Sequence, residues 1–373
     1  MSHYEERLAT DRRAIDARIL AVGERVGAAH EAALRALLAR DHELAYRTVL
    51  EDHPVNREVR AIEAACHAFV ARHLPSAGHL RWVSSALRLC VALERIGDYA
   101  STICRAAVQL EQDVPPTIAR DLELMGDQSR RVLAQALRAW GEQSADLARG
   151  TVGMAGQAEG ASGKVFGDLL RVGEKERARA ERRVALSDLF ALLVIFNRLD
   201  RVVAQAKNVC EETLFAAAGE TKPAKTYRLL FVDAGDDSWS QLAAAYGSKA
   251  FGDIARFEHA GWQPAEAIDP RCLVFMERHG LDGSGLAPHS LRTEPSSAGR
   301  VELDDAHVVV SLGGDLRAHV DSIPFHTVLL EWNVGPVLAG LDQERAESLL
   351  DLGFRMLQSR ITELLETLRG GLE

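Results

Sequence analysis

The sequence predicts a multidomain protein in which a duplicated all-α three-helix bundle is followed by an α/β domain with a parallel sheet. Three observations lead to this prediction. Apolar residues recur at spacings of three and four through about the first 218 residues, which is the pattern of amphipathic helices. A stretch reading Gly-Glu-Thr-Lys-Pro-Ala-Lys-Thr then interrupts the pattern at residues 219–226. After it, strand-like runs alternate with helical ones, as in parallel sheets flanked by helices.

Three helices are expected in the first part of the chain. An apolar stripe along residues 11–38 predicts the first. A second runs from about residue 42 past residue 69 and is ended by Pro75, because the proline ring removes a backbone donor and disfavours helix before it. A third begins near His79. Its apolar stripe has the spacing of helices packed lengthwise and comprises Val83, Ala86, Cys90, Leu93, Gly97, Ala100 and Cys104.

The next part of the chain repeats the first. After two consecutive prolines, long helices are expected at residues 118–140 and 184–215, with a Gly-rich weak point near residues 150–163. Placing residues 94–104 over residues 200–210 aligns identical Arg, Ala and Cys residues. We interpret this as two three-helix units from one ancestral bundle; chance similarity between two helices is the alternative.

The last third of the chain alternates between strand and helix patterns. Strand-like runs are expected at residues 227–233, 306–311 and 326–331, and helical runs at residues 240–246, 270–279 and 342–368. The predicted organisation is therefore a helical domain at 1–218 (repeats about 1–112 and 113–218), a linker at 219–226, an α/β domain at 227–340 and a C-terminal helix at 341–373.

The composition is that of a globular protein, with 47% hydrophobic and 26% charged residues. A net charge of −10 would repel a phosphate backbone. The most basic run, Lys175–Arg183, mixes both signs at helical spacing, which is typical of a solvated helix face. Nucleic-acid binding is therefore not expected.

The sequence also bears on location. The first residues have no export signal, and the most apolar run, Leu189–Phe196, is far shorter than the roughly 18–20 residues that cross a bilayer. Five cysteines without a C-x-x-C pair fit reduced thiols that fill the core. We therefore expect a cytoplasmic protein with no membrane span.

Glu94 and Asp98 form an acidic pair on the third helix. Their spacing of four places both carboxylates on one helix face about a turn apart, where like charges repel. A bound cation is one way to compensate, since oxygen ligands suit hard or borderline metals. An ordinary acidic patch is the alternative.

The segment around this pair, Leu-Glu-Arg-Ile-Gly-Asp-Tyr-Ala at residues 93–100, resembles the signature helix of the PhoU family. Asp-His-Glu-Leu-Ala at residues 41–45, Asp52 with Asn56, and Pro-Ser-Ala-Gly-His-Leu-Arg at residues 75–81 are similar to further segments of that family. His79 stands where the family usually has Asp. The resemblance covers about residues 1–218. It implies that iron, zinc or manganese binds the first repeat at Asp52, Asn56, Glu94 and Asp98.

The second repeat departs from this ligand pattern. Asp200 and Ala204 align with the acidic pair, and an ungapped extension places Ala155 and Glu159 over Asp52 and Asn56. Half of the ligands are therefore missing. We expect at most one well-formed metal cluster, in the first repeat, with Asp200 as the remaining candidate from the second.

Residues 227–240, Tyr-Arg-Leu-Leu-Phe-Val-Asp-Ala-Gly-Asp-Asp-Ser-Trp-Ser, resemble the start of low-molecular-weight tyrosine phosphatases and the related arsenate reductases. Those enzymes use a C-x5-R-S loop, in which a thiolate attacks, backbone amides cradle the phosphate and an arginine clamps it. Here Asp233 stands at the cysteine, Trp239 at the arginine, and Gly335 at the Asp of a later D-P segment that supplies the general acid. The resemblance spans about residues 226–340 and implies a degenerate domain.

The charges of this loop oppose anion binding. Asp233, Asp236 and Asp237 would face a bound oxyanion, and each like-charge pair near 4 Å costs about 4 kcal/mol at an effective dielectric of 20. A helix N-terminus returns at most about 2 kcal/mol. We therefore expect the loop to reject phosphate and to cap the helix that follows it. A cation bound there is the alternative.

Together these resemblances imply a non-enzymatic accessory regulator of phosphate uptake or phosphate signalling. It would contact a phosphate transporter component or a sensor histidine kinase through metal-dependent protein contacts, with a homodimer as a further expectation. Two alternatives stay open. One is an active phosphatase or arsenate reductase with an unusual nucleophile such as Asp233. The other is a metal-binding scaffold unrelated to phosphate.

Overall fold

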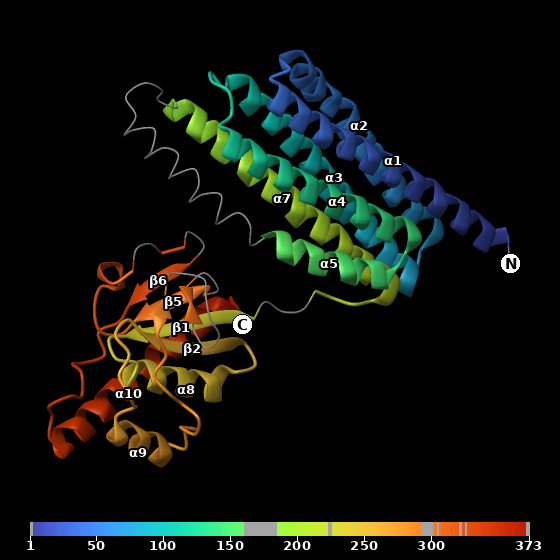
Figure 1. Cartoon of the computed structure of the whole chain (residues 1–373). Helices are drawn as coiled ribbons and strands as arrows, with labels where there is room; N and C mark the ends of the chain where they lie inside the picture. Colours follow the sequence, from blue (N-terminus) through green and yellow to red (C-terminus); the bar gives the residue numbers. More distant parts are fainter. Residues whose placement is uncertain are drawn as a thin grey trace. The chain divides into compact units, whose positions relative to one another are not determined.

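The computed structural model describes residues 3–159, 185–222, 226–292, 301–303, 306–320, 323–324 and 327–370. It divides into two compact units, Met1–Pro223 and Ala224–Glu373, and each is treated by itself (Figure 1). The charged run Lys175–Arg183 lies outside the described residues, as does residue 326, with which one strand-like run was expected to begin.

The first unit is all-helical where it is described, which confirms the predicted class (Figure 1). Its helices are long and lie roughly along one another, as expected for a bundle. They are α1 (His3–Ala39), α2 (His42–His73), α3 (Ala77–Gln109), α4 (Pro116–Glu142), α5 (Ala145–Glu159) and α7 (Leu186–Ala218).

Local signals in the sequence set several of these helix ends. The side chain of Asp41 accepts a hydrogen bond from the backbone N–H of Leu44 at 2.9 Å and caps the start of α2. That helix ends at His73, just before Pro75, where Leu74 adopts a left-handed conformation that closes it. The weak point expected near residues 150–163 is contradicted as far as Glu159, to which α5 continues, and the rest of it lies outside the described residues.

The third helices of the two repeats, α3 and α7, pack against each other (Figure 1). Glu212 on α7 accepts hydrogen bonds from Ser85 Oγ and from the guanidinium of Arg88 on α3, both at 2.9 Å. At the other end of α7, the buried carboxylate of Asp188 accepts from the backbone N–H groups of Glu111 and Gln112. These hydrogen bonds at the two ends of α7 set the lengthwise register of α7 against α3. They thereby set the register between the two repeats.

All five cysteines are buried, as expected for residues that fill the core. Burial raises the pKa of every one of these thiols, because a thiolate loses its hydration there. The values are about 11 for Cys66 and Cys104 and about 12 for Cys90, Cys210 and Cys272.

The second unit is built on a four-stranded sheet in the order β2-β1-β5-β6, with every neighbouring pair parallel. This confirms the predicted α/β class with a parallel sheet. The strands are β1 (Tyr227–Asp233), β2 (Ala255–Gly261), β5 (Val308–Ser311) and β6 (Val328–Glu331), and β3 (Leu291–Arg292) pairs separately with β4 (Val301–Glu302). The helices are α8 (Trp239–Phe251), α9 (Pro270–Arg278) and α10 (Gln343–Arg369).

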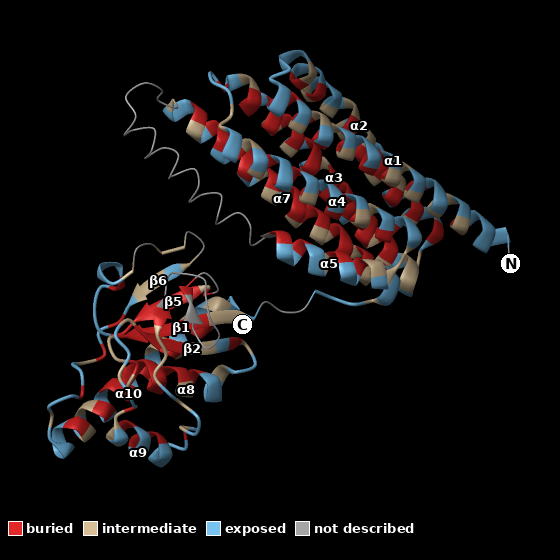
Figure 2. Cartoon of the chain, in the orientation of Figure 1, coloured by how far each residue is buried: buried red, intermediate tan, exposed pale blue. Residues whose placement is uncertain are grey.

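The side chains of β1 are divided between two apolar clusters, as the alternation of a strand requires. Leu229 and Phe231 pack in one cluster with residues of α8, α9 and α10, whereas Leu230 and Val232 pack in the other with Val309. The C-terminal helix α10 thus belongs to this unit's core, and Figure 2 shows its buried face. Because the strands are parallel, the turn after β1 and the end of β2 meet at the same edge of the sheet.

Among the helices that the structure describes, none combines the length and apolar character needed to cross a membrane.

His30 predicts how the stability of the first unit depends on pH. Its ring is fully buried, and Nε2 lies 2.7 Å from Ser129 Oγ. Burial, followed by the charge of Arg130, lowers the pKa of His30 to about 4. Since an unfolded histidine has a pKa of about 6.5, the unfolded state takes up a proton first as the pH falls. The free energy of unfolding should therefore drop by about 2 kcal/mol between pH 7 and pH 5.

His30→Gln keeps a hydrogen-bonding side chain that does not titrate, so it should remove this part of the pH dependence. Urea unfolding of both proteins at the two pH values, followed by circular dichroism, measures the difference. An identical drop in the two proteins would contradict the prediction.

Gly23 and Gly27 lie one turn apart on α1 and offer a matched test of the packing between α1 and α4. A Cβ added at Gly23 would lie 2.4 Å from Cδ2 of Leu137, whereas nothing lies within 4 Å of one added at Gly27. Gly27→Ala should raise the free energy of unfolding by about 0.5–1 kcal/mol. Gly23→Ala should lower it by about 1 kcal/mol or more, because Leu137 must move. Chemical denaturation measures both, and equal stabilisation by the two would show that α1 and α4 pack less closely than described.

Candidate functional site

The acidic residues of the first repeat lie where α2 meets α3. On α2, Asn56 Nδ2 donates a hydrogen bond to Asp52 Oδ2 at 3.0 Å. A Cβ added at Gly97 of α3 would lie 2.9 Å from Asp52 Oδ1, so the absence of a side chain there lets the carboxylate approach α3. Asp52 Oδ1 and Asn56 Oδ1 are both buried and accept no hydrogen bond from the protein. Two buried acceptors therefore remain unsatisfied at this point.

Asp98 faces this pair from α3. Partial desolvation, and then the charge of Asp52, raise the pKa of Asp98. The structure therefore places Asp98 near Asp52, which is in turn hydrogen-bonded to Asn56. It does not gather Asp52, Glu94 and Asp98 tightly, since these three do not have ligand atoms that all lie within 4.8 Å of one another.

Asp200, the remaining candidate from the second repeat, lies on α7 and is half-buried. Among the described residues it joins no group of three His, Cys, Asp or Glu side chains at that spacing. Ala155, which aligns with Asp52, is fully buried in the core of the bundle. An apolar contact thus occupies the position that corresponds to a polar site in the first repeat.

The turn after β1 is held by the carboxylate of Asp233. Its Oδ1 accepts from the backbone N–H of Asp236 at 2.5 Å, and its Oδ2 accepts from that of Ser240, in the first turn of α8, at 2.9 Å. Asp233 therefore caps α8, which is the role expected from the acidic residues of this turn. Burial raises the pKa of Asp233 to about 6 even though these two donors lower it.

Asp236 does not face outward into an anion-binding loop, and the prediction that it would face a bound oxyanion was wrong. Its side chain is fully buried, and its backbone is left-handed with φ 50°. The carboxylate accepts from Ser240 Oγ and from the backbone N–H of His289, each at 2.7 Å. His259 Nδ1 lies 2.9 Å from both of its oxygens. The turn folds its acidic groups inward because these donors lie on the inside.

Asp237 remains half-buried, and its Oδ1 accepts from Ser238 Oγ at 3.0 Å. Trp239, which stands at the arginine position, is buried at 2% exposure, and its indole N–H donates to the carbonyl of Pro336 at 3.1 Å. A Cβ added at Gly335 would lie 3.6 Å from that indole. Trp239 and Gly335 therefore contribute to packing, and neither supplies a positive charge that could bind an anion.

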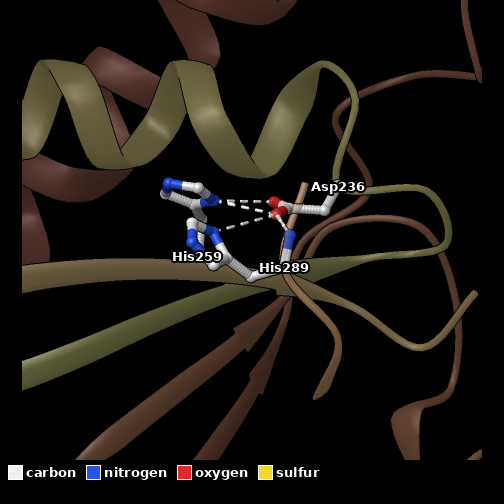
Figure 3. A group of neighbouring side chains, drawn as sticks. All are labelled: Asp236, His259 and His289. Atoms are coloured by element: carbon white, nitrogen blue, oxygen red, sulfur yellow. Dashed lines mark hydrogen bonds and ion pairs between the residues drawn. The ribbon is translucent and has the colours of Figure 1, made fainter. Parts of the chain in front are cut away.

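His259 and His289 were not predicted as site residues. Together with Asp236 they form the one group among the described residues whose ligand atoms all lie within 4.8 Å of one another (Figure 3). Residue spacing gave no signal for them, because the three residues lie in separate segments. Only the parallel pairing of β1 with β2 brings the turn next to His259.

Comparisons with known proteins agree with the predicted helical region. A family model of the PhoU domain matches residues 19–107. A protein named phosphate-specific transport system accessory protein PhoU homolog, from Pseudomonas putida, is 28% identical over 218 residues, which cover 58% of this chain and 83% of that protein. The crystal structure of PhoU from Pseudomonas aeruginosa aligns with a TM-score of 0.53 and 25% identity, over 57% of this chain and 99% of that chain.

A thioredoxin-dependent arsenate reductase from Corynebacterium glutamicum also aligns, at 21% identity over 46% of this chain and 77% of that chain. Its TM-score of 0.30 is too low to support a functional inference. The PhoU matches, in contrast, agree in sequence and in fold. Residues 19–107 of this chain therefore match the PhoU domain, within an N-terminal helical unit that resembles the PhoU proteins in sequence and fold.

Proposed function

We propose that this chain is an accessory regulator of phosphate uptake or phosphate signalling that acts through protein contacts of its PhoU-domain unit. The observation that carries the proposal is the match to the PhoU domain model. It is supported by the similarity to the phosphate-specific transport system accessory protein of Pseudomonas putida, which covers 83% of that protein. The partner would be a phosphate transporter component or a sensor histidine kinase, and the interaction would take place in the cytoplasm. The C-terminal unit would serve as a binding module without catalysis.

The contacts of the first repeat support a metal-dependent form of this function. Asp52 Oδ1 and Asn56 Oδ1 are buried acceptors without a protein donor, and a cation would satisfy both. Asp98, whose raised pKa reflects the nearby charge of Asp52, would supply a third oxygen, with Glu94 one turn away on α3. Iron, zinc or manganese suits such donors. A metal held there would link α2 to α3 and shape the surface that a partner meets.

The turn after β1 supports a non-catalytic C-terminal unit. A covalent nucleophile needs a free, activated atom, but both oxygens of Asp233 accept hydrogen bonds from backbone N–H groups. The Cys272 thiol is no substitute, since burial, followed by the charges of Asp269 and Asp237, raises its pKa to about 12.

The regulatory proposal predicts the behaviour of a strain that lacks the gene. Phosphate uptake at high external phosphate should lose its restraint and regain it on complementation with the wild-type chain. The double variant Asp52→Asn, Asp98→Asn should bind metal at least about tenfold more weakly and should restore control poorly. Glu51→Gln is the matched control, because Glu51 neighbours Asp52 on α2 but is exposed and faces Arg47.

Radiolabelled phosphate uptake and elemental analysis of the purified proteins measure these effects. Normal phosphate control in the deletion strain would sink the regulatory proposal and favour a scaffold unrelated to phosphate. Full complementation by the double variant would overturn only the role of the metal.

A catalytically inactive C-terminal unit predicts no turnover of a generic aryl phosphate by the full chain. Asp233→Asn and the neighbouring Asp237→Asn should leave the same background rate, because neither residue acts as a nucleophile. Release of nitrophenol from nitrophenyl phosphate measures that rate. Hydrolysis by the wild type that disappears in Asp233→Asn alone would establish the phosphatase alternative instead.

A further inference from the structure

A carboxylate and two imidazole rings converge at one edge of the parallel sheet in the C-terminal unit. Asp236 lies in the turn after β1, His259 lies in β2, and His289 lies just before β3. Figure 3 shows both rings directed toward the carboxylate of Asp236. Neither the PhoU match nor the regulatory proposal assigns this group a role.

The carboxylate of Asp236 is fixed before any ligand arrives. Ser240 Oγ and the backbone N–H of His289 donate to its two oxygens, each at 2.7 Å. The side chain of Gln241 also donates to the Asp236 carbonyl at 2.5 Å. A residue held both at its carboxylate and at its backbone carbonyl keeps one orientation, which lowers the cost of forming a site.

The backbone brings His289 to this carboxylate. The N–H of Gly261, at the end of β2, donates to the carbonyl of His289 at 2.8 Å. A Cβ added at Gly261 would lie 2.8 Å from both Ala234 O and Asp236 N. Glycine at this position therefore lets the turn approach the end of β2, to which the His289 segment is hydrogen-bonded.

His289 has the geometry of a ligand that lacks its ion. Its Nδ1 lies 3.9 Å from Asp236 Oδ2, which is too far for a hydrogen bond. That nitrogen is nevertheless buried and has no hydrogen-bond partner, although 38% of the side chain is exposed. A buried polar atom in this position calls for an unseen partner, such as an ion.

The spacing of the three groups suits a small divalent ion. Zinc bonds of about 2.0–2.1 Å in a tetrahedron put neighbouring ligand atoms about 3.3 Å apart. The distances from the Asp236 carboxylate, 2.9 Å to His259 Nδ1 and 3.9 Å to His289 Nδ1, lie on either side of that value. Small side-chain movements would equalise them.

The chemistry of the donors narrows the choice of ion. Two imidazoles and one carboxylate suit zinc and its transition-metal neighbours, whereas calcium and magnesium prefer oxygen ligands throughout. The charges agree, because the carboxylates of Asp233 and Asp236 are buried in one turn that Asp237 follows. The arrangement that disfavours an oxyanion is favourable to a cation.

We propose that Asp236, His259 and His289 form a binding site for a divalent transition-metal ion of the zinc class. The Nδ1 atoms of both histidines and one oxygen of Asp236 are its three protein ligands, and water takes the fourth position on the exposed side of His289. The ion ties the turn after β1 to β2 and to the segment before β3.

Metal titration of the chelator-treated full-length chain tests this site. Zinc is added in a calorimeter, and cobalt(II) is added separately to record its visible absorption. The wild type should bind zinc, and cobalt should show the bands of a nitrogen-ligated ion. In the background of Asp52→Asn with Asp98→Asn, which removes the candidate zinc site of the first repeat, His289→Gln should weaken zinc binding at least about a hundredfold, because even changes outside the ligand shell cost tenfold to a hundredfold. This variant is preferred to a change at Asp236, which holds the turn together.

Two control variants make the result specific. His279→Gln removes a ring of similar exposure, 39%, that also lies 3.9 Å from a carboxylate, that of Asp351, but belongs to no three-residue group. It should leave zinc binding unchanged. Asp52→Asn with Asp98→Asn disables the candidate site of the first repeat and should preserve the cobalt bands.

In the variant that lacks the first-repeat site, equal zinc affinity with and without His289→Gln would overturn the proposal, as would the absence of zinc binding. The proposal would also be overturned if the cobalt bands vanished only in the variant Asp52→Asn with Asp98→Asn, since the metal would then lie in the helical unit. Circular dichroism of each variant confirms that it is folded. Because this test reads metal binding and not phosphate uptake, it can fail without affecting the regulatory proposal, and the reverse also holds.

Discussion

The carboxylate of Asp233 accepts hydrogen bonds from two backbone N–H groups, and the arrangement of the turn after β1 depends on this interaction. One donor belongs to the first turn of α8, where backbone N–H groups have no partner within the helix. A bound anion often satisfies such groups. Here the chain supplies the anion from its own strand end, so an external oxyanion would have to displace a buried side chain.

The same interaction determines where the next acidic residue lies. With Asp236 N bound to Asp233, the backbone at Asp236 becomes left-handed, and its side chain enters the interior beside His259. The turn is thus closed to anions and lined with carboxylate on its inner side. The aspartate at the end of β1 closes the turn to anions, and the donors from Ser240 and His289 hold the second carboxylate inside it.

The sequence predicted the large features of the molecule because these depend on local periodicity. The apolar stripes gave the helices of the bundle, and the alternation after residue 226 gave the parallel sheet. It located the turn after β1 but misjudged which way Asp236 points, since that direction depends on donors from Ser240 and His289. The partnership of Asp236 with two histidines could not be predicted, because strand pairing creates it and no residue spacing encodes it. In the bundle, spacing placed Glu94 and Asp98 on one face, but it could not show that Asp52 reaches α3 beside Gly97.

The burial of all five cysteines has a practical and a chemical consequence. With their pKa values raised to between about 11 and about 12, the thiols are almost entirely protonated at neutral pH and are shielded from solvent. They are therefore poor targets for oxidants and alkylating reagents. A cysteine introduced on the surface of either unit would be the reactive thiol of the folded chain. Such a residue could carry a fluorophore or spin label without removal of the native cysteines, so the motions of the two units could be followed in the otherwise unaltered protein.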